Sequence, residues 1–167
     1  DGNIDIDGTL TFAASSSTCD VSGNWDDAGG TLAYTAFAGK VIFSGAGTID
    51  NRAAGANPLI LVTIEGNYTA NTDILIEGTL DIENAGILDP VTSTITCRNI
   101  PIQIKAGGAL TFTGDGTFSS TGASTLTVLG TGAITFHTDV GAGGKLSLTD
   151  NDADLGNNFT ANEGTVE

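Results

Sequence analysis

The stretch STCDVSGNWDDAGGTLAY, residues 17–34, decides the fold, because a less regular copy lies 78 positions later, within STITCRNIPIQIKAGGALTF, residues 93–112. In this alignment Cys19 corresponds to Cys97, and Ala-Gly-Gly at residues 28–30 corresponds to Ala-Gly-Gly at residues 106–108. Gly-Thr-Val at residues 164–166 lies a further 78 positions beyond Gly-Ile-Leu at residues 86–88. Internal similarity of this kind predicts stacked units. We interpret residues 1–167 as a single domain of two approximate 78-residue repeats plus the start of a third.

A short pattern of glycine, a small residue and then alternating apolar and polar residues recurs through the chain. It reads GTLTF at residues 8–12, GTLDI at residues 78–82 and GALTF at residues 108–112. Alternation with a period of two predicts short strands that bury one face. Helical periodicity is nearly absent, so the chain is predicted to be all-β.

Strands this short need stacking to be stable, and coils with glycine at each corner provide it. The glycine spacing predicts a parallel β-solenoid of about seven short coils, each of roughly 20–25 residues and without obvious end caps. At ~4.8 Å between strands, such a stack is ~30–40 Å tall. A Greek-key β-sandwich is the rival architecture, because short strands with frequent turns describe it as well.

The sequences VSGNW at residues 21–25, GTL at residues 30–32 and KVIFSGAGTI at residues 40–49 resemble repeats of a known group. These are the secreted right-handed parallel β-helix proteins of bacterial and archaeal surfaces, which include adhesins and haemagglutinin-like exoproteins. The resemblance implies a right-handed β-solenoid on or outside the cell.

The composition limits the classes of partner. The 167 residues carry 20 Asp and Glu against 5 Lys and Arg, a formal charge of -15, which argues against nucleic acid because phosphate contacts require basic patches. No apolar run approaches the ~18–20 residues that cross a bilayer. The chain has no Met and begins at Asp1, so a processed, secreted protein is expected. The sequons at Asn67 and Asn158 are glycosylation candidates.

Catalytic signals are weak, and we expect no enzyme. His137 is the single histidine, and no Gly-x-Ser-x-Gly elbow accompanies it. Lys and Arg are scattered, whereas lyase chemistry on acidic sugars needs them gathered around the substrate. No catalytic residue is therefore assigned, although a β-helix glycan enzyme with clustered carboxylates is retained as a third reading.

Metal binding is the more plausible chemistry. Asp150, Asp152 and Asp154 alternate as the ligands of a calcium loop do, but the expected glycine and the distal bidentate Glu are missing. A solvated acidic turn is the alternative reading. A second acidic area, formed by Asp5, Asp7, Asp20, Asp26 and Asp27, is expected near the N-terminus and could meet the first if subunits joined end to end. Ca²⁺ is the one cofactor considered.

The two cysteines are disulfide candidates. Equivalent positions 78 residues apart would lie ~15–20 Å apart, whereas a disulfide needs Cα atoms within about 7 Å. A bond within the chain is therefore not expected. Two alternatives remain: two buried free thiols, or a bond between Cys19 of one subunit and Cys97 of the next.

The predicted function follows from the ends of the solenoid, which expose unpaired strand edges. The leading hypothesis is a secreted structural protein that polymerises head to tail into an extracellular filament with itself as partner. The alternative is a surface-binding or glycan-binding module of an adhesin. The residues proposed for the subunit interface are Ile4, Ile6, Leu10, Phe159 and Val166.

Overall fold

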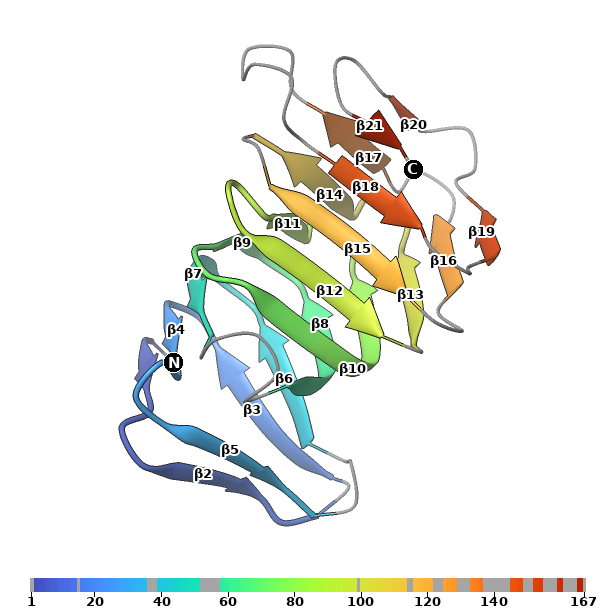
Figure 1. The fold of residues 1–167 in the computed structure, drawn as a ribbon. Helices are drawn as coiled ribbons and strands as arrows, with labels where there is room; N and C mark the ends of the chain where they lie inside the picture. The colour runs from blue at the N-terminus through green and yellow to red at the C-terminus, as the bar shows by residue number, and fades with distance from the viewer. Residues whose placement is uncertain are drawn as a thin grey trace.

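The computed structural model is a stack of short parallel strands (Figure 1). It describes residues 2–14, 16–35, 39–51, 58–98, 100–113, 116–121, 125–128, 133–136, 145–148, 152–154, 159–160 and 165–166. All regular structure in these residues is β, and every strand pair among them is parallel. Nor do these residues contain a helix able to cross a bilayer.

The strands follow one another closely along the chain. The first ten are β1 (Ile4–Asp5), β2 (Thr9–Phe12), β3 (Ser17–Val21), β4 (Trp25–Asp26), β5 (Thr31–Tyr34), β6 (Gly39–Phe43), β7 (Ala46–Asp50), β8 (Leu59–Ile64), β9 (Asn67–Ala70) and β10 (Ile74–Ile82). The next six are β11 (Ile87–Asp89), β12 (Thr94–Arg98), β13 (Pro101–Ile104), β14 (Ala109–Phe112), β15 (Thr117–Thr121) and β16 (Thr125–Val128). The last five are β17 (Ala133–Phe136), β18 (Lys145–Leu148), β19 (Asp152–Asp154), β20 (Phe159–Thr160) and β21 (Thr165–Val166).

One sheet runs the length of the stack. Its order is β1-β4-β7-β9-β11-β14-β17-β20, eight strands. Ile4 pairs with Trp25, 21 positions later, and Ile134 pairs with Phe159, 25 positions later. One coil therefore takes between about 20 and 25 residues, as the glycine spacing predicts.

The second sheet has eleven strands and branches at β10. The first part of β10 pairs with β12, and its last part pairs with β8 and β13. Two rows of strands result: β3-β6-β8-β10-β13-β16-β19, and β10-β12-β15-β18-β21. A separate two-stranded sheet joins β2 to β5.

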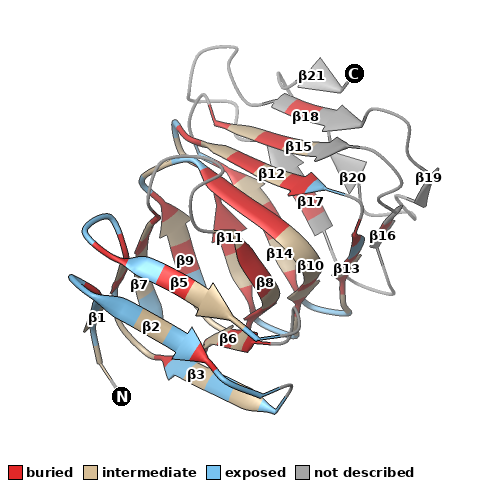
Figure 2. Ribbon diagram, turned by 60° about the horizontal axis from the view of Figure 1, so that its bottom comes forward, coloured by how far each residue is buried: buried red, intermediate tan, exposed pale blue. Residues whose placement is uncertain are grey.

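Most apolar residues of the strands are buried and form one core cluster from Ile6 to Leu146. Figure 2 shows the buried positions along the inner faces and the exposed positions gathered around β2 at the N-terminal end. Trp25, Phe43 and Tyr68 are fully buried and pack in sequence, with ring centroids 6.1 Å and 5.0 Å apart. The Tyr68 hydroxyl donates a hydrogen bond to the Val21 carbonyl over 2.7 Å, so the aromatic core ties coils together.

Glycine stands at the corners where successive coils approach most closely. A Cβ on Gly66 would lie 1.7 Å from the carbonyl oxygen of Gly45, and a Cβ on Gly45 would lie 2.0 Å from that of Ser22. No side chain fits at such a distance. The recurring Gly therefore reflects backbone stacking.

The prediction of an all-β parallel solenoid is confirmed, and the parallel pairing excludes the antiparallel Greek-key sandwich. Three strands of the first sheet, β1, β4 and β20, contain two residues each. The stack forms about five turns, slightly fewer than the seven coils predicted.

The 78-residue similarity does not match the stacking. Cys19 lies in β3, in the row that ends at β19, whereas Cys97 lies in β12, in the row that ends at β21. Likewise Leu32 lies in β5 of the two-stranded sheet, and Leu110 lies in β14 of the eight-stranded sheet. The alignment compares different sides of the solenoid, because every side uses the same Gly-x-apolar strand pattern.

Candidate functional site

The N-terminal end of the stack is open. In the described residues β1 pairs only with β4, β2 only with β5, and β3 only with β6. Each of these three strands therefore has one edge without a strand partner. Unpaired strand edges are templates for pairing with another chain.

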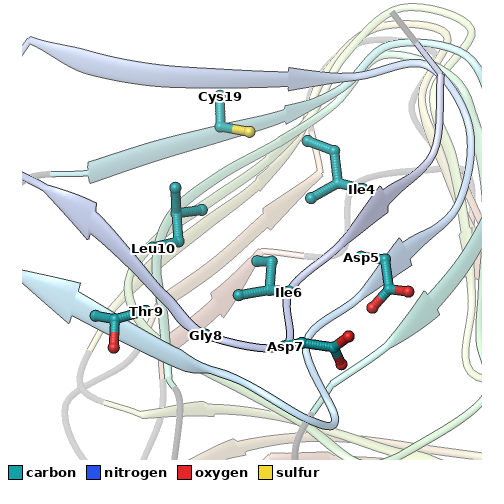
Figure 3. A pocket seen from close by; sticks show the side chains of 8 residues that line it. All are labelled: Ile4, Asp5, Ile6, Asp7, Gly8, Thr9, Leu10 and Cys19. Carbon is teal, nitrogen blue, oxygen red and sulfur yellow. The ribbon is translucent and has the colours of Figure 1, made fainter.

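A hollow of about 330 Å³ lies between these three strands (Figure 3). The apolar side chains of Ile4, Ile6 and Leu10 face one another across it, with the Cys19 thiol on the side of β3. Asp5, Asp7, Gly8 and Thr9 complete the lining. Ile4, Leu10 and Cys19 are only partly buried, so the core of the solenoid reaches solvent here.

Backbone hydrogen bonds to the second coil fix this hollow. The Ile4 amide donates to the Asn24 carbonyl over 2.7 Å, and the Ile6 amide donates to the Asp26 carbonyl over 2.8 Å. The Thr31 amide donates to the Gly8 carbonyl over 2.8 Å. The apolar surface is therefore presented by an ordered scaffold, as a binding surface requires.

The interface residues predicted from sequence divide between the two ends. Ile4, Ile6 and Leu10 are brought together in the hollow. Phe159 lies in β20 and Val166 in β21, the last strands of their rows at the opposite end. Sequence reasoning missed Cys19 as a member of this surface. Cys19 lies in β3, the first strand of its row, and this position near the N-terminus could have indicated that it borders the open end. The sequence alignment of Cys19 with Cys97 instead suggested an equivalent position inside the stack.

The acidic area near the N-terminus is only partly exposed. Asp5, Asp7 and Asp20 are exposed, and Asp20 accepts a hydrogen bond from the Ser44 hydroxyl over 2.5 Å. Asp27 is instead fully buried and accepts a hydrogen bond from the Asn51 amide group over 3.3 Å. The expectation that Asp27 belongs to the acidic surface is therefore wrong, because its neighbour in the next coil is a polar core residue.

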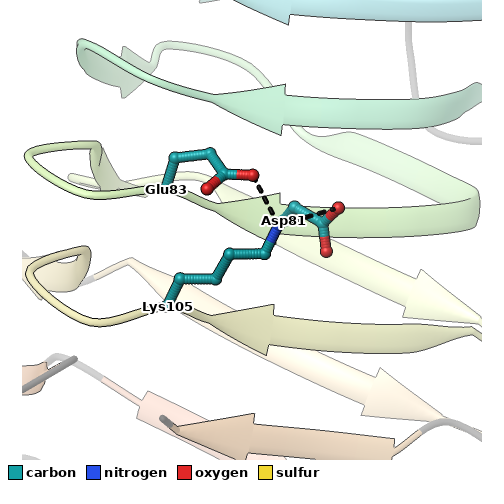
Figure 4. A network of polar contacts seen from close by, with 3 residues as sticks. All are labelled: Asp81, Glu83 and Lys105. Atoms are coloured by element: carbon teal, nitrogen blue, oxygen red, sulfur yellow. Dashed lines mark hydrogen bonds and ion pairs between the residues drawn. The ribbon is translucent and has the colours of Figure 1, made fainter. Parts of the chain in front are cut away.

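Cations are few, and one of them bridges two carboxylates midway along the stack (Figure 4). The Lys105 ammonium lies 2.5 Å from Glu83 Oε1 and 3.7 Å from Asp81 Oδ2. The hydrogen bond with Glu83 raises the pKa of Lys105. The cluster relieves repulsion between stacked acidic residues, although exposed pairs of this kind contribute little to stability.

The remaining predicted residues are placed as follows. Asp152 and Asp154 begin and end β19, while Asp150, His137 and Asn158 lie outside the described residues. Within the described part of the chain no three His, Cys, Asp or Glu side chains are grouped as metal ligands are. The Ca²⁺ site stays a prediction. Asn67 is exposed at the start of β9, so its sequon is accessible.

Neither Cys19 nor Cys97 forms a disulfide bond. Cys97 is completely buried in the core, and burial raises its pKa. Cys19 is half-buried beside the hollow, and its pKa is raised by burial and by the Asp20 charge. A bond between Cys19 of one subunit and Cys97 of another would require the core to open, so Cys97 is a poor partner for it.

The buried thiol predicts a loss of stability in alkali. An unfolded cysteine ionises near pH ~8.5, whereas folded Cys97 stays protonated well above that pH. Its contribution is therefore present below pH ~8.5 and falls above it, by up to ~1.4 kcal/mol per pH unit. We expect denaturant midpoints measured from pH 8 to 10 to decline steeply in the native protein and in Cys19→Ala. The decline should be shallower in Cys97→Ala, and equal slopes in all three proteins would contradict this assignment.

The fold defines the class of this protein: it is a parallel β-solenoid. No family model, curated protein or solved structure matched the chain.

Proposed function

We propose that this protein is a structural subunit that assembles head to tail into a filament outside the cell. The observation that supports the proposal is the hollow at the N-terminal end, where half-buried Ile4, Leu10 and Cys19 are bordered by three strand edges. A second copy is the occupant that we propose, because its last strands are parallel to these edges and end the same stack.

Burial of the hollow supplies the driving force. Apolar surface removed from water contributes ~25 cal/mol per Å², and each new strand pair satisfies backbone groups that face water in the monomer. The contact is heterologous, since one end meets the opposite end of the next copy, and such contacts propagate without closing. The charge of -15 per copy would oppose lateral bundling of filaments, and the role is structural rather than catalytic.

Location outside the cell is part of the proposal. The exposed position of Asn67 in its sequon is compatible with it, as is the resemblance of the sequence stretches 21–25, 30–32 and 40–49 to repeats of secreted surface proteins. The adhesin reading is the second candidate, and the half-exposed hydroxyls of Thr94, Thr96, Thr117 and Ser119 on β12 and β15 would suit a polar ligand. An adhesin module would bind such a ligand as a monomer.

The substitution Leu10→Asp tests the assembly. Leu10 is half-buried beside the hollow, so a carboxylate there would be tolerated in the monomer but desolvated without a partner in the filament. We expect at least a tenfold rise in the protein concentration needed for assembly, measured by sedimentation, with a nearly unchanged unfolding midpoint.

Thr11→Asp is the matched control, because Thr11 is the next residue of β2 and is exposed. It adds the same charge on the opposite face of the strand and should assemble at close to the native concentration. Assembly of Leu10→Asp at the native concentration would show that the hollow is not the contact.

A further inference from the structure

We propose that the eight-stranded sheet continues across the junction between two copies, with Phe159 of one copy opposite Gly2 of the next. This inference rests on the proposed head-to-tail assembly and specifies its register. It is based on a glycine that pairs with a large aromatic residue in the neighbouring strand of the stack.

The described residues of the stack contain an internal example of such a pairing. Gly47 in β7 is the register partner of Tyr68 in β9, whose ring is fully buried. From Tyr68 the same row of register partners continues through Leu88, Leu110 and Ile134 to Phe159. The sequence NYTAN at residues 67–71 recurs as NFTAN at residues 158–162. Phe159 therefore holds, at the last strand, the position that Tyr68 holds above Gly47.

The other end of this row consists of glycines. Trp25 pairs with Ile49 and Ile4 pairs with Trp25. Extending these two registers by two residues, beyond the starts of β4 and β1, aligns Gly23 with Gly47 and Gly2 with Gly23. The Gly23 amide donates to the Gly2 carbonyl over 3.1 Å. Among the described residues other than its chain neighbours, no atom lies within 4 Å of the place where a Cβ of Gly2 would be. In the described part of the chain the row thus ends at Gly2, and residue 159 of a second copy can be placed level with it.

The unequal lengths of the rows add a second constraint. The first sheet has eight strands, whereas the row from β3 to β19 has seven. If β20 is followed in the first sheet by the segment that leads into β1 of the next copy, β19 and the next β3 cannot pair directly. They lie two strand spacings apart, about 9–10 Å, which exceeds the reach of a disulfide. Register partners link Cys19 in β3, strand by strand, to Ala153 in β19. In the alternative junction β19 of one copy pairs with β3 of the next, and Ala153 of the first copy would then lie level with Cys19 of the second.

Disulfide trapping between two variants tests the register. In a Cys19→Ser background, Asn3→Cys and Thr160→Cys are made separately, mixed under reducing conditions, assembled and then oxidised. Thr160 follows Phe159, as the exposed Asn3 follows Gly2, so the proposed register brings these two positions level with each other. Their Cα atoms would lie ~4.8 Å apart, within the range that a disulfide spans. We expect covalent dimers in the mixture and none in either variant alone.

Two comparisons exclude other junctions. In the first, Asp5→Cys is mixed with Thr160→Cys, and covalent dimers would indicate a register shifted by two residues. In the second, Ala153→Cys is made in the protein that retains the native Cys19, and covalent dimers would indicate direct pairing of β19 with β3. Neither should form dimers. A bond in either comparison, or filaments with no bond between positions 3 and 160, would overturn the proposed register. Absence of filaments from the native protein would instead overturn the proposed function itself.

Discussion

Replacing Trp25 with alanine is expected to lower the free energy of unfolding by about 3–5 kcal/mol, the range for deleting a large buried aromatic side chain. Trp25 is fully buried in the second coil and packs edge-on against Phe43. Phe43 in turn contacts Tyr68, so the substitution opens a cavity at the start of the aromatic core. Chemical denaturation monitored by far-UV circular dichroism would measure the loss.

Trp25→Phe is the matched control for the ring. Within the described residues the indole Nε1 has no hydrogen-bond partner, so phenylalanine removes a buried donor that is not satisfied there. The cost should therefore be less than half that of alanine. If Trp25→Phe destabilised the protein as much as Trp25→Ala, an unrecognised polar role of the indole would be required.

Substitution of Gly66 with alanine is expected to cost about 3 kcal/mol, at the upper end of the range for overpacking a tight site. The new Cβ would lie 1.7 Å from the Gly45 carbonyl oxygen, and that atom belongs to the backbone of the preceding coil. No rotamer change relieves such a contact. The two coils must move apart, which strains hydrogen bonds such as that from the Asn67 amide to the Gly45 carbonyl, 2.9 Å long.

Gly8→Ala provides the comparison, because no atom of the described residues beyond its chain neighbours lies within 4 Å of its Cβ position and its backbone does not have a positive φ. Alanine there should be neutral or stabilising by about 0.4–1 kcal/mol, since it restricts the unfolded chain. Equal effects of the two substitutions on the denaturation midpoint would show that chain stiffness, rather than backbone stacking, explains the corner glycines.

The architecture was largely predictable from sequence because stacking leaves a local signature. Strands such as Thr9–Phe12 and Ala109–Phe112 alternate apolar and polar residues after glycine, and that pattern identifies a strand without any long-range information. The side of the solenoid on which a strand lies leaves no such signature. For this reason Cys19 and Cys97 were aligned although they belong to different rows.

The open end was predictable only in part. Ile4, Ile6 and Leu10 were identified from the repeat phase, and the structure brings them around one hollow. The burial of Asp27 against Asn51 and the unequal lengths of the strand rows were not predictable. Both depend on coil lengths that vary from 20 to 25 residues, so one insertion in a corner moves every later residue relative to its neighbours.

Electron microscopy of the native protein at high concentration, with calcium present and without a reducing agent, tests the central claim most directly. Eight strands per copy at ~4.8 Å predict uniform filaments with an axial repeat of about 38 Å. Loss of these filaments in Leu10→Asp, with retention in Thr11→Asp, would tie them to the N-terminal hollow. Dispersed single particles under the same conditions would contradict the head-to-tail assembly.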